Sequence, residues 1–513
     1  MKFRLTFFCV LFFALQASAT RLFIPMDAKT QTNHLKAYGI AYAAMQHGIK
    51  VQWLLNYKGG SFVMELSKEM EQLCRQRTVA CSRITEKQYA GIIKQVNAPS
   101  FNGNVVTLEK APAIAVYTPP GKKPWDDAVT LALTYAEIPF DKLYASEVLA
   151  GNLDKYDWLH LHPEDFTGRY GKFWAQFRTL DWYQQDVRAM EALAAKNGFK
   201  KVSQMQLAVV KKIRAFVAGG GNLFAMCSAT QTFDIALAAA NTDICAGPFD
   251  GDPVTTGVGT ELDYTNCIAF KDFSVDLDAL SYTQANIDNN NYRRIPEEFD
   301  LFTLAAPPAR FDQVPAMLCQ NHTPTVNGFM GQATAFRKAV LKPGVQVLGD
   351  FTELKEAKYI HGELRKGSWT FLGGHDPEDY QHMVYDPVTD LALHPNSPGY
   401  RLILNNVLVP AAARTVVPTV IMHGEDHKDA PTAAKQVIME KEIKMYPNPA
   451  TSELIITLSS GTIQHITVLN TNGQEVISKP FAAAKASVDM KALPPGMYLI
   501  KVNGEYAGKI IKE

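Results

Sequence analysis

The sequence predicts an α/β fold with a doubly wound, mostly parallel sheet, followed by a small C-terminal β-sandwich. Two patterns support this fold class. Between residues 113 and 409, short apolar runs alternate with helical patterns, as they do in open parallel sheets. From Lys444 onward, short alternating strands are separated by Asn-Gly and Pro-Gly turns, as in all-β units. The 513 residues are enough for about two to four domains.

The first 19 residues have the pattern of a signal peptide. Lys2 and Arg4 precede an apolar run over residues 5–15, and Ala17-Ser18-Ala19 has the form of a signal-peptidase site. We therefore expect an exported mature chain that begins at Thr20. No later apolar run is long enough to predict a transmembrane span.

Charge is balanced, with 51 basic and 51 acidic residues. No basic block and no alternation of basic with aromatic residues occurs, which argues against nucleic-acid binding and against a membrane-surface helix.

Residues 20–112 are expected to form an N-terminal α/β segment that packs on the core. A strand over residues 21–25, a helix over 33–46 and a strand over 50–55 predict a βαβ start. The segment has no phosphate-binding loop spacing, so no nucleotide site is predicted in it.

The core is predicted over residues 113–409. Within it, residues 245–333 lose the helix–strand rhythm, and we interpret them as an insertion near the mouth of a pocket, where functional loops collect. Residues 410–443 are rich in Pro, Ala and charge and are expected to be a linker. The β-sandwich is expected over residues 444–513.

The first chemical motif follows a strand predicted over residues 153–161. That strand ends in the sequence His160-Leu161-His162-Pro163-Glu164-Asp165. Because side chains alternate along a strand, His160 and His162 are expected on one face. These two histidines, with Glu164 and Asp165, are candidate substrate-binding residues, and two histidines beside carboxylates can also bind a metal. The alternative is that they are ordinary polar residues at a strand end.

The central motif surrounds Cys227. A helix is predicted up to Ala218, three glycines end it, residues 222–226 form a short apolar strand, and residues 228–240 return to a helical pattern. Cys227 therefore lies at the carboxyl end of a buried strand, where open α/β sheets bind ligands, and near a helix N-terminus that favours a thiolate. It is either a nucleophile or a plain buried cysteine.

A third motif follows the strand predicted over residues 368–372, and it reads Gly373-Gly374-His375-Asp376-Pro377-Glu378-Asp379. Because His375 also follows a strand, we expect it to meet Cys227 at the same edge of the sheet. Strands over residues 345–349 and 359–362 and a helix over 399–407 complete the core.

With these motifs in place, residues 113–407 resemble the class I glutamine amidotransferase-like fold, which is flavodoxin-like. The elbow at Cys227, the segment KGSWTFLGGHDPE and the strand YDWLHLH carry the resemblance. It implies that Cys227 is the nucleophile and His375 the base, with an orienting acid after it. Asp376 stands between His375 and Pro377, so the acid is either Glu378 or Asp376.

The last 70 residues resemble the C-terminal sorting domain of the Bacteroidetes type IX secretion system. The match is carried by Tyr446-Pro447-Asn448-Pro449, Asn472-Gly473 and Gly496-Met497-Tyr498. The resemblance implies recognition by the type IX machinery after passage through the periplasm, and a final location in the medium or on the outer cell surface. The whole chain also resembles exported Bacteroidetes proteins sometimes labelled asparagine synthetase B, but it has no SGGxDS-type loop for that chemistry.

Six cysteines follow the signal peptide, namely Cys74, Cys81, Cys227, Cys245, Cys267 and Cys319. If residues 71–81 form one helix, Cys74 and Cys81 are about 10 Å apart along it and cannot be bridged. If Cys227 is unpaired, five cysteines remain. Because five is an odd number, at least one other thiol is also expected to be free.

Three functions remain open at this point. The first is a cysteine-dependent hydrolase or amidase that acts on an unknown extracellular amide or peptide-like bond, with no cofactor. The second is a surface protein that binds glycan or peptide without catalysis. The third is a metal-dependent hydrolase that uses the ligands His160, His162, Glu164, His375 and His382.

Overall fold

The computed structural model describes residues 19–119, 127–257, 261–288, 296–351, 354–383, 386–413, 443–447, 450–458, 461–470, 475–503 and 505–512. The chain divides into two compact units, residues 1–415 and 416–513, and each is described by itself. The signal peptide up to residue 18 and most of the predicted linker, residues 414–442, lie outside the described residues.

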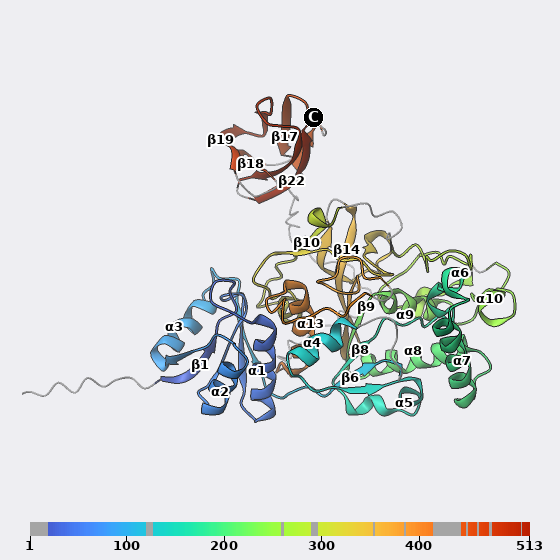
Figure 1. The fold of residues 1–513 in the computed structure, drawn as a ribbon. Helices are drawn as coiled ribbons and strands as arrows, with labels where there is room; N and C mark the ends of the chain where they lie inside the picture. The colour runs from blue at the N-terminus through green and yellow to red at the C-terminus, as the bar shows by residue number, and fades with distance from the viewer. Residues whose placement is uncertain are drawn as a thin grey trace, which may run out of the picture. The chain divides into compact units, whose positions relative to one another are not determined.

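The N-terminal segment, drawn in blue in Figure 1, forms a sheet of its own. This sheet has five strands in the order β4-β1-β3-β2-β5. Its strands are β1 (Ala19–Ile24), β2 (Val51–Leu55), β3 (Ser61–Glu65), β4 (Ser82–Thr85) and β5 (Asn104–Leu108). The two predicted strands are present as β1 and β2, joined by a helix and parallel to each other, but β3 lies between them and pairs antiparallel with both. The reason is the turn at Gly59 and Gly60, whose positive φ angles fold β3 back onto β2 as a hairpin and place β3 between β1 and β2.

Three helices accompany this sheet: α1 (His34–Gln46), α2 (Lys68–Gln76) and α3 (Glu86–Val96). Asn33 caps α1 by accepting a hydrogen bond from the Lys36 N–H, and Ser67 caps α2 in the same way from Met70. Helix α1 packs against α13 (Pro398–Leu408), so the N-terminal segment shares one hydrophobic core with the sheet that follows.

The second sheet has the strand order β11-β10-β13-β14-β15-β9-β8-β6-β7, with β12 paired to β14. The strands β6 (Ile114–Tyr117), β7 (Asp141–Leu143), β8 (Trp158–Leu161), β9 (Asn222–Met226) and β15 (Gly367–Leu372) pair in parallel. The strands β10 (Leu301–Leu304), β11 (Thr325–Asn327), β12 (Phe336–Arg337), β13 (Gln346–Phe351) and β14 (Glu356–Leu364) pair antiparallel. The expectation of a mostly parallel sheet therefore describes one half of it.

Helices cover both faces of the parallel half. On one face, α4 (Ala128–Tyr135) and α13 pack together over Trp158 and Phe224. On the other face, α5 (Ala145–Leu149), α8 (Val202–Gly219) and α9 (Ser228–Ala238) cover Leu159, Leu223 and Phe371. Neighbouring strand residues thus point to opposite faces, and each fully buried Leu or Phe contributes roughly 1.5–3 kcal/mol.

The short helix η1 (Asn152–Lys155) precedes β8. The connection between β8 and α8 carries η2 (Tyr170–Lys172), α6 (Trp174–Phe177) and α7 (Asp181–Lys196). The insertion predicted at residues 245–333 contains α10 (Gly247–Asp250), η3 (Tyr264–Asn266), η5 (Glu297–Phe299) and α12 (Gln313–Leu318). It is more than a surface loop, because it also supplies β10 and β11 to the antiparallel edge of the sheet. The short helices η6 (Lys338–Val340) and η8 (Val409–Ala411) follow later in the chain.

The C-terminal unit consists of two small sheets, β16-β17-β20 and β19-β18-β21-β22. Its strands are β16 (Ile443–Tyr446), β17 (Glu453–Leu458), β18 (Ile463–Leu469), β19 (Glu475–Ala483), β20 (Lys485–Asp489), β21 (Gly496–Val502) and β22 (Glu505–Lys512). Leu454 and Val488 of one sheet share a core with Ile466 and Ile500 of the other, which makes the unit a β-sandwich. Asn448, Pro449 and the Asn472-Gly473 turn lie outside the described residues.

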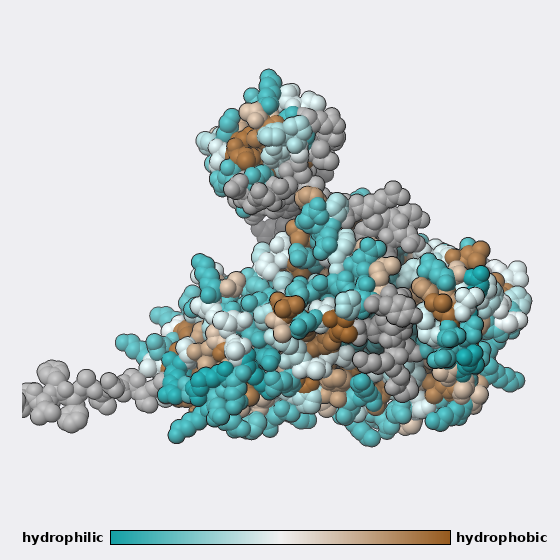
Figure 2. Space-filling view, viewed as in Figure 1, coloured by the Kyte–Doolittle hydropathy of each residue, from teal (hydrophilic) through white to brown (hydrophobic). Residues whose placement is uncertain are grey.

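On the face seen in Figure 2, hydrophobic side chains form small groups between hydrophilic ones, the usual state of a protein surface. Among the helices that the structure describes, none combines the length and the apolar character needed to cross a bilayer.

Candidate active site around Cys227

Cys227 occupies a strained turn between β9 and α9. Its φ of 52° and ψ of −137° fall in a region that side chains other than glycine rarely adopt, at a cost of about 1–3 kcal/mol. The Cys227 N–H donates to the Gly374 carbonyl at 3.1 Å, which ties the elbow to the end of β15. The predicted strand over residues 222–226 is confirmed, and Cys227 lies where the pattern placed it.

The sulfur of Cys227 is surrounded by backbone N–H groups. The Gln332 N–H donates to it at 3.3 Å, and those of Ala333 and Ser228 also point at it. The residue is only 5% exposed. Burial raises the pKa of the Cys227 thiol, and the three N–H groups offset this only in part. The thiol is therefore neutral at neutral pH and needs a base before it can attack.

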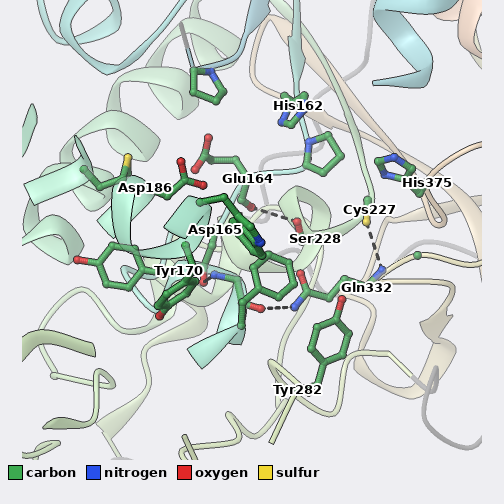
Figure 3. Close-up of a pocket in the computed structure, with 18 of the residues that line it drawn as sticks. His162, Glu164, Asp165, Tyr170, Asp186, Cys227, Ser228, Tyr282, Gln332 and His375 are labelled. Atoms are coloured by element: carbon green, nitrogen blue, oxygen red, sulfur yellow. Dashed lines mark hydrogen bonds between the residues drawn. The ribbon is translucent and has the colours of Figure 1, made fainter. Parts of the chain in front are cut away.

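A pocket of about 630 Å³ opens beside the elbow (Figure 3). Figure 3 draws Cys227, His375 and Gln332 on one side of it, with Glu164, Asp186 and Tyr170 on the other. Six aromatic side chains line it: Tyr144, Tyr170, Phe173, Trp182, Tyr183 and Tyr282. A pocket of this size with apolar walls and a few polar groups is the usual form of a small-molecule or peptide-end site.

His375 follows β15 and lines the same pocket as Cys227. The backbone N–H of His375 donates to the Met330 carbonyl at 2.9 Å. The turn after β15 is therefore held by the loop that also carries Gln332, whose N–H donates to the Cys227 sulfur. The His375 ring stacks on that of His382, with 4.7 Å between centroids. Asp379 in turn holds His382 through a contact of 2.7 Å between Oδ2 and Nδ1.

The two candidate orienting acids have other contacts. Glu378 pairs with His394, with 3.0 Å between Oε2 and Nδ1. Asp376 is buried, and its Oδ1 accepts the Glu378 N–H at 2.9 Å. The acid nearest to the stacked histidines in these contacts is Asp379, which was not among the predicted site residues. Asp379 lies in the same acidic segment of the sequence as Asp376 and Glu378. Only its contact with His382 in the folded protein distinguishes it from those two acids.

Of the two histidines at the end of β8, His162 lines the pocket and His160 does not. His160 is fully buried in the core, where Nε2 lies 3.0 Å from the Asp127 carboxylate and Nδ1 lies 3.2 Å from the Phe224 carbonyl. Burial acts to raise the pKa of Asp127, but His160, His162 and the Val129 N–H outweigh it and hold that pKa below its usual range. This placement gives His160 a structural role and removes it from the predicted substrate-binding set.

Glu164 and Asp165 both line the pocket. Glu164 Oε2 accepts the Tyr144 hydroxyl at 3.2 Å, and its carbonyl accepts the Thr232 hydroxyl of α9 at 2.8 Å. Asp165 is buried and accepts the N–H groups of Thr167 and Gly171, each at 2.7 Å. Asp165 therefore builds the loop after β8, whereas Glu164 is placed to face a bound molecule.

The structure does not bring the predicted metal ligands together as one group within the described residues. Within the described residues, the groups whose ligand atoms lie within 4.8 Å of one another are Asp243–Cys245–Asp250 and Asp379–His382–Asp386. The second group contains His382, one of the predicted ligands, but neither group combines it with the β8 histidines or with His375.

Sequence reasoning expected the insertion near the pocket, but it did not identify the residues that the insertion and α7 contribute to the site. Gln332 and Tyr282 come from the insertion, and Trp182 and Asp186 come from α7. The many aromatic residues between positions 170 and 183 were the one local signal that this segment lines a binding pocket. The Gln332 contact had no local signal, because it joins residues 105 positions apart.

Comparison with known families identifies residues 444–513 as a secretion system C-terminal sorting domain. The domain marks proteins that are secreted or attached to the surface through type IX secretion, and it implies an interaction with that machinery. No curated protein matches the chain.

Similar solved structures include a protein described as a cytoplasmic protein from Salmonella typhimurium, at 10% identity and a TM-score of 0.30 over 59% of this chain and all of that one. A β-galactosidase from Bacillus circulans sp. alkalophilus has 11% identity and a TM-score of 0.25 over 79% of this chain and 41% of its own. These TM-scores are too low to carry a conclusion about fold or activity.

Proposed function

We propose that this exported protein is a cysteine-dependent hydrolase that cleaves an amide or peptide-like bond, with Cys227 as nucleophile. The observation that carries the proposal is the strained Cys227 elbow on the pocket wall, with backbone N–H groups of Gln332 and Ser228 aimed at its sulfur. Backbone strain of this kind concentrates at functional sites, where the surrounding structure must hold it in place.

The fold class supports the proposal. Numbered along the chain, the parallel strands β6, β7, β8, β9 and β15 have the spatial order 2-1-3-4-5, which is the flavodoxin-like order. In this order the carboxyl ends of the central strands carry the ligand site, and Cys227, His162 and His375 follow β9, β8 and β15. We therefore assign residues 113–409 to a flavodoxin-like, glutamine amidotransferase-like core with an antiparallel extension.

The reaction follows from these positions. His375 takes the proton of the Cys227 thiol as the sulfur attacks the substrate carbonyl carbon. N–H groups of Ser228 and Gln332 stabilise the oxyanion that forms. The amine then leaves with the proton from His375, and a thioester remains on Cys227. Water, deprotonated by His375, hydrolyses the thioester and releases a carboxylic acid.

A panel of fluorogenic amides and short peptides tests the proposal on the purified chain. We expect Cys227→Ala to lower turnover of any accepted substrate by several orders of magnitude, because the nucleophile is lost. Cys319→Ala is the matched control, since that thiol lies away from the pocket and contacts the Leu348 carbonyl. Full turnover by Cys227→Ala would refute the assignment.

A second candidate is a surface protein that binds peptide or glycan in the same pocket without catalysis. The raised pKa and the 5% exposure of Cys227 favour it, because an inert thiol has these properties. Under this function, Cys227→Ala binds a captured peptide or glycan as tightly as the wild type, and neither protein turns it over.

A further inference from the structure

The cysteines of the mature chain differ in what their sulfurs contact. Three of them donate to backbone carbonyl groups: Cys245 to Thr167, Cys267 to Asp234 and Cys319 to Leu348. Cys227 belongs to the candidate active site. Cys74 and Cys81 are left, and their side chains are in hydrogen-bond contact with each other.

The expectation that Cys74 and Cys81 are too far apart for a bridge depended on one helix over residues 71–81, and that helix is not formed, although both thiols are free in this structure. Helix α2 ends at Gln76, and Thr78 adopts a left-handed φ of 54° that reverses the chain. The Val79 N–H returns to the Cys74 carbonyl at 2.8 Å, and Gln31 holds Ala80 through a 2.9 Å hydrogen bond. The turn thus brings Cys81 back against Cys74.

We propose that Cys74 and Cys81 form a disulfide bond in the exported protein. The two thiols lie beside each other, the turn between them is fixed by hydrogen bonds, and the sorting domain marks the chain as one that leaves the reducing cytosol. The bond links the last turn of α2 to the start of β4, the edge strand of the N-terminal sheet. It does not depend on the proposed hydrolase activity.

The two thiols differ in a way that sets the order of the reaction. Cys81 is partly exposed, whereas Cys74 is fully buried. The hydrogen bond from the Cys74 thiol is the main cause that lowers the pKa of Cys81 to about 7. Cys81 is therefore the thiol that can first meet an external oxidant as a thiolate.

The oxidant is a disulfide, either of a thiol–disulfide oxidoreductase or of a small molecule such as glutathione disulfide. The Cys81 thiolate attacks one sulfur of that disulfide, a mixed disulfide forms, and one thiolate leaves. The Cys74 sulfur, after losing its proton to solvent, attacks the Cys81 sulfur and displaces the second thiolate. The two cysteines lose two electrons in total, and the external disulfide is reduced to two thiols.

Peptide mapping of the exported protein from its host tests the proposal directly. Free thiols are blocked with iodoacetamide without reductant, and the chain is cut with trypsin. Because Arg75 and Arg77 lie between the two cysteines, trypsin places Cys74 on residues 69–75 and Cys81 on residues 78–83. We expect these two peptides to be joined, lighter than their sum by two hydrogen atoms, and separated by reductant.

A second measurement uses the full chain purified under reducing conditions and then treated with glutathione disulfide. We expect the loss of two free thiols in the wild type, and none in the double variant Cys74→Ser/Cys81→Ser. The matched double variant Cys267→Ser/Cys319→Ser should still lose two. The proposal is overturned if both target peptides from the exported protein carry the iodoacetamide label, or if either cysteine is joined to a different one.

Discussion

The N–H of Gln332 donates a hydrogen bond to the sulfur of Cys227 at 3.3 Å, across 105 positions of sequence. Gln332 belongs to the insertion, and its side-chain amide also donates to the Gly171 carbonyl in the loop after β8. One residue thus connects the Cys227 turn, the insertion and the loop that carries the aromatic wall. The insertion completes the site rather than merely bordering it.

Replacing Cys227 by glycine should give a more stable protein than replacing it by alanine. Alanine keeps the side-chain strain of a φ of 52° and ψ of −137°, whereas glycine adopts these angles freely, so we expect a difference of about 1 kcal/mol in the free energy of unfolding. Urea unfolding of both variants measures it. The control is Ala225→Gly within β9, which should lower stability by about 0.5–1 kcal/mol. Equal stability of the two Cys227 variants would argue against strain at the elbow.

His361 should make the protein less stable as the pH falls. Burial in β14 lowers the pKa of His361 from 6.5 to about 4. Between these values the unfolded chain binds a proton that the folded chain does not, so stability is complete above pH 6.5 and declines toward pH 4 by roughly 3 kcal/mol. Unfolding at several pH values should show a smaller decline for His361→Gln than for the wild type. An unchanged decline in His361→Gln would contradict the account.

Deleting the sorting domain should prevent delivery to the medium or cell surface without unfolding the first unit, residues 1–415. The chain separates into two compact units, each with its own core, and the family match covers only residues 444–513. A chain ending at residue 443 should therefore keep the thermal unfolding transition of the first unit and fail to reach the medium or cell surface. Fractionation of host cells and calorimetry of the purified protein check the two halves of this prediction. Export of the truncated chain at the normal level would contradict it.

Local patterns in the sequence predicted β9, the Cys227 turn and α9 well. Three glycines end the preceding helix, five apolar residues follow, and an alanine-rich helix begins directly after the cysteine. Each of these signals is contained within a few residues, so no long-range information is needed. The same holds for the alternating strands of the β-sandwich.

The sequence did not predict contacts that depend on chain reversals and distant pairing. The hairpin at Gly59 and Gly60 placed β3 between the two strands of the expected βαβ start, and the turn at Thr78 brought Cys81 to Cys74. Likewise, Glu378 pairs with His394, a partner that no local pattern specifies. Which acid follows a histidine in sequence therefore does not decide which acid contacts it.

The most direct test of the central claim is acylation of Cys227 by p-nitrophenyl acetate, followed by peptide mass. The account predicts that native wild-type protein is acetylated at Cys227, because its sulfur lines the pocket and His375 removes its proton. His375→Gln should react about 10²- to 10⁴-fold more slowly, in the range of a lost general base, and Cys319→Ala should react as fast as the wild type. No acetylation of native Cys227, in a chain whose Cys227 is acetylated once unfolded, or an equal rate in His375→Gln, would contradict the account.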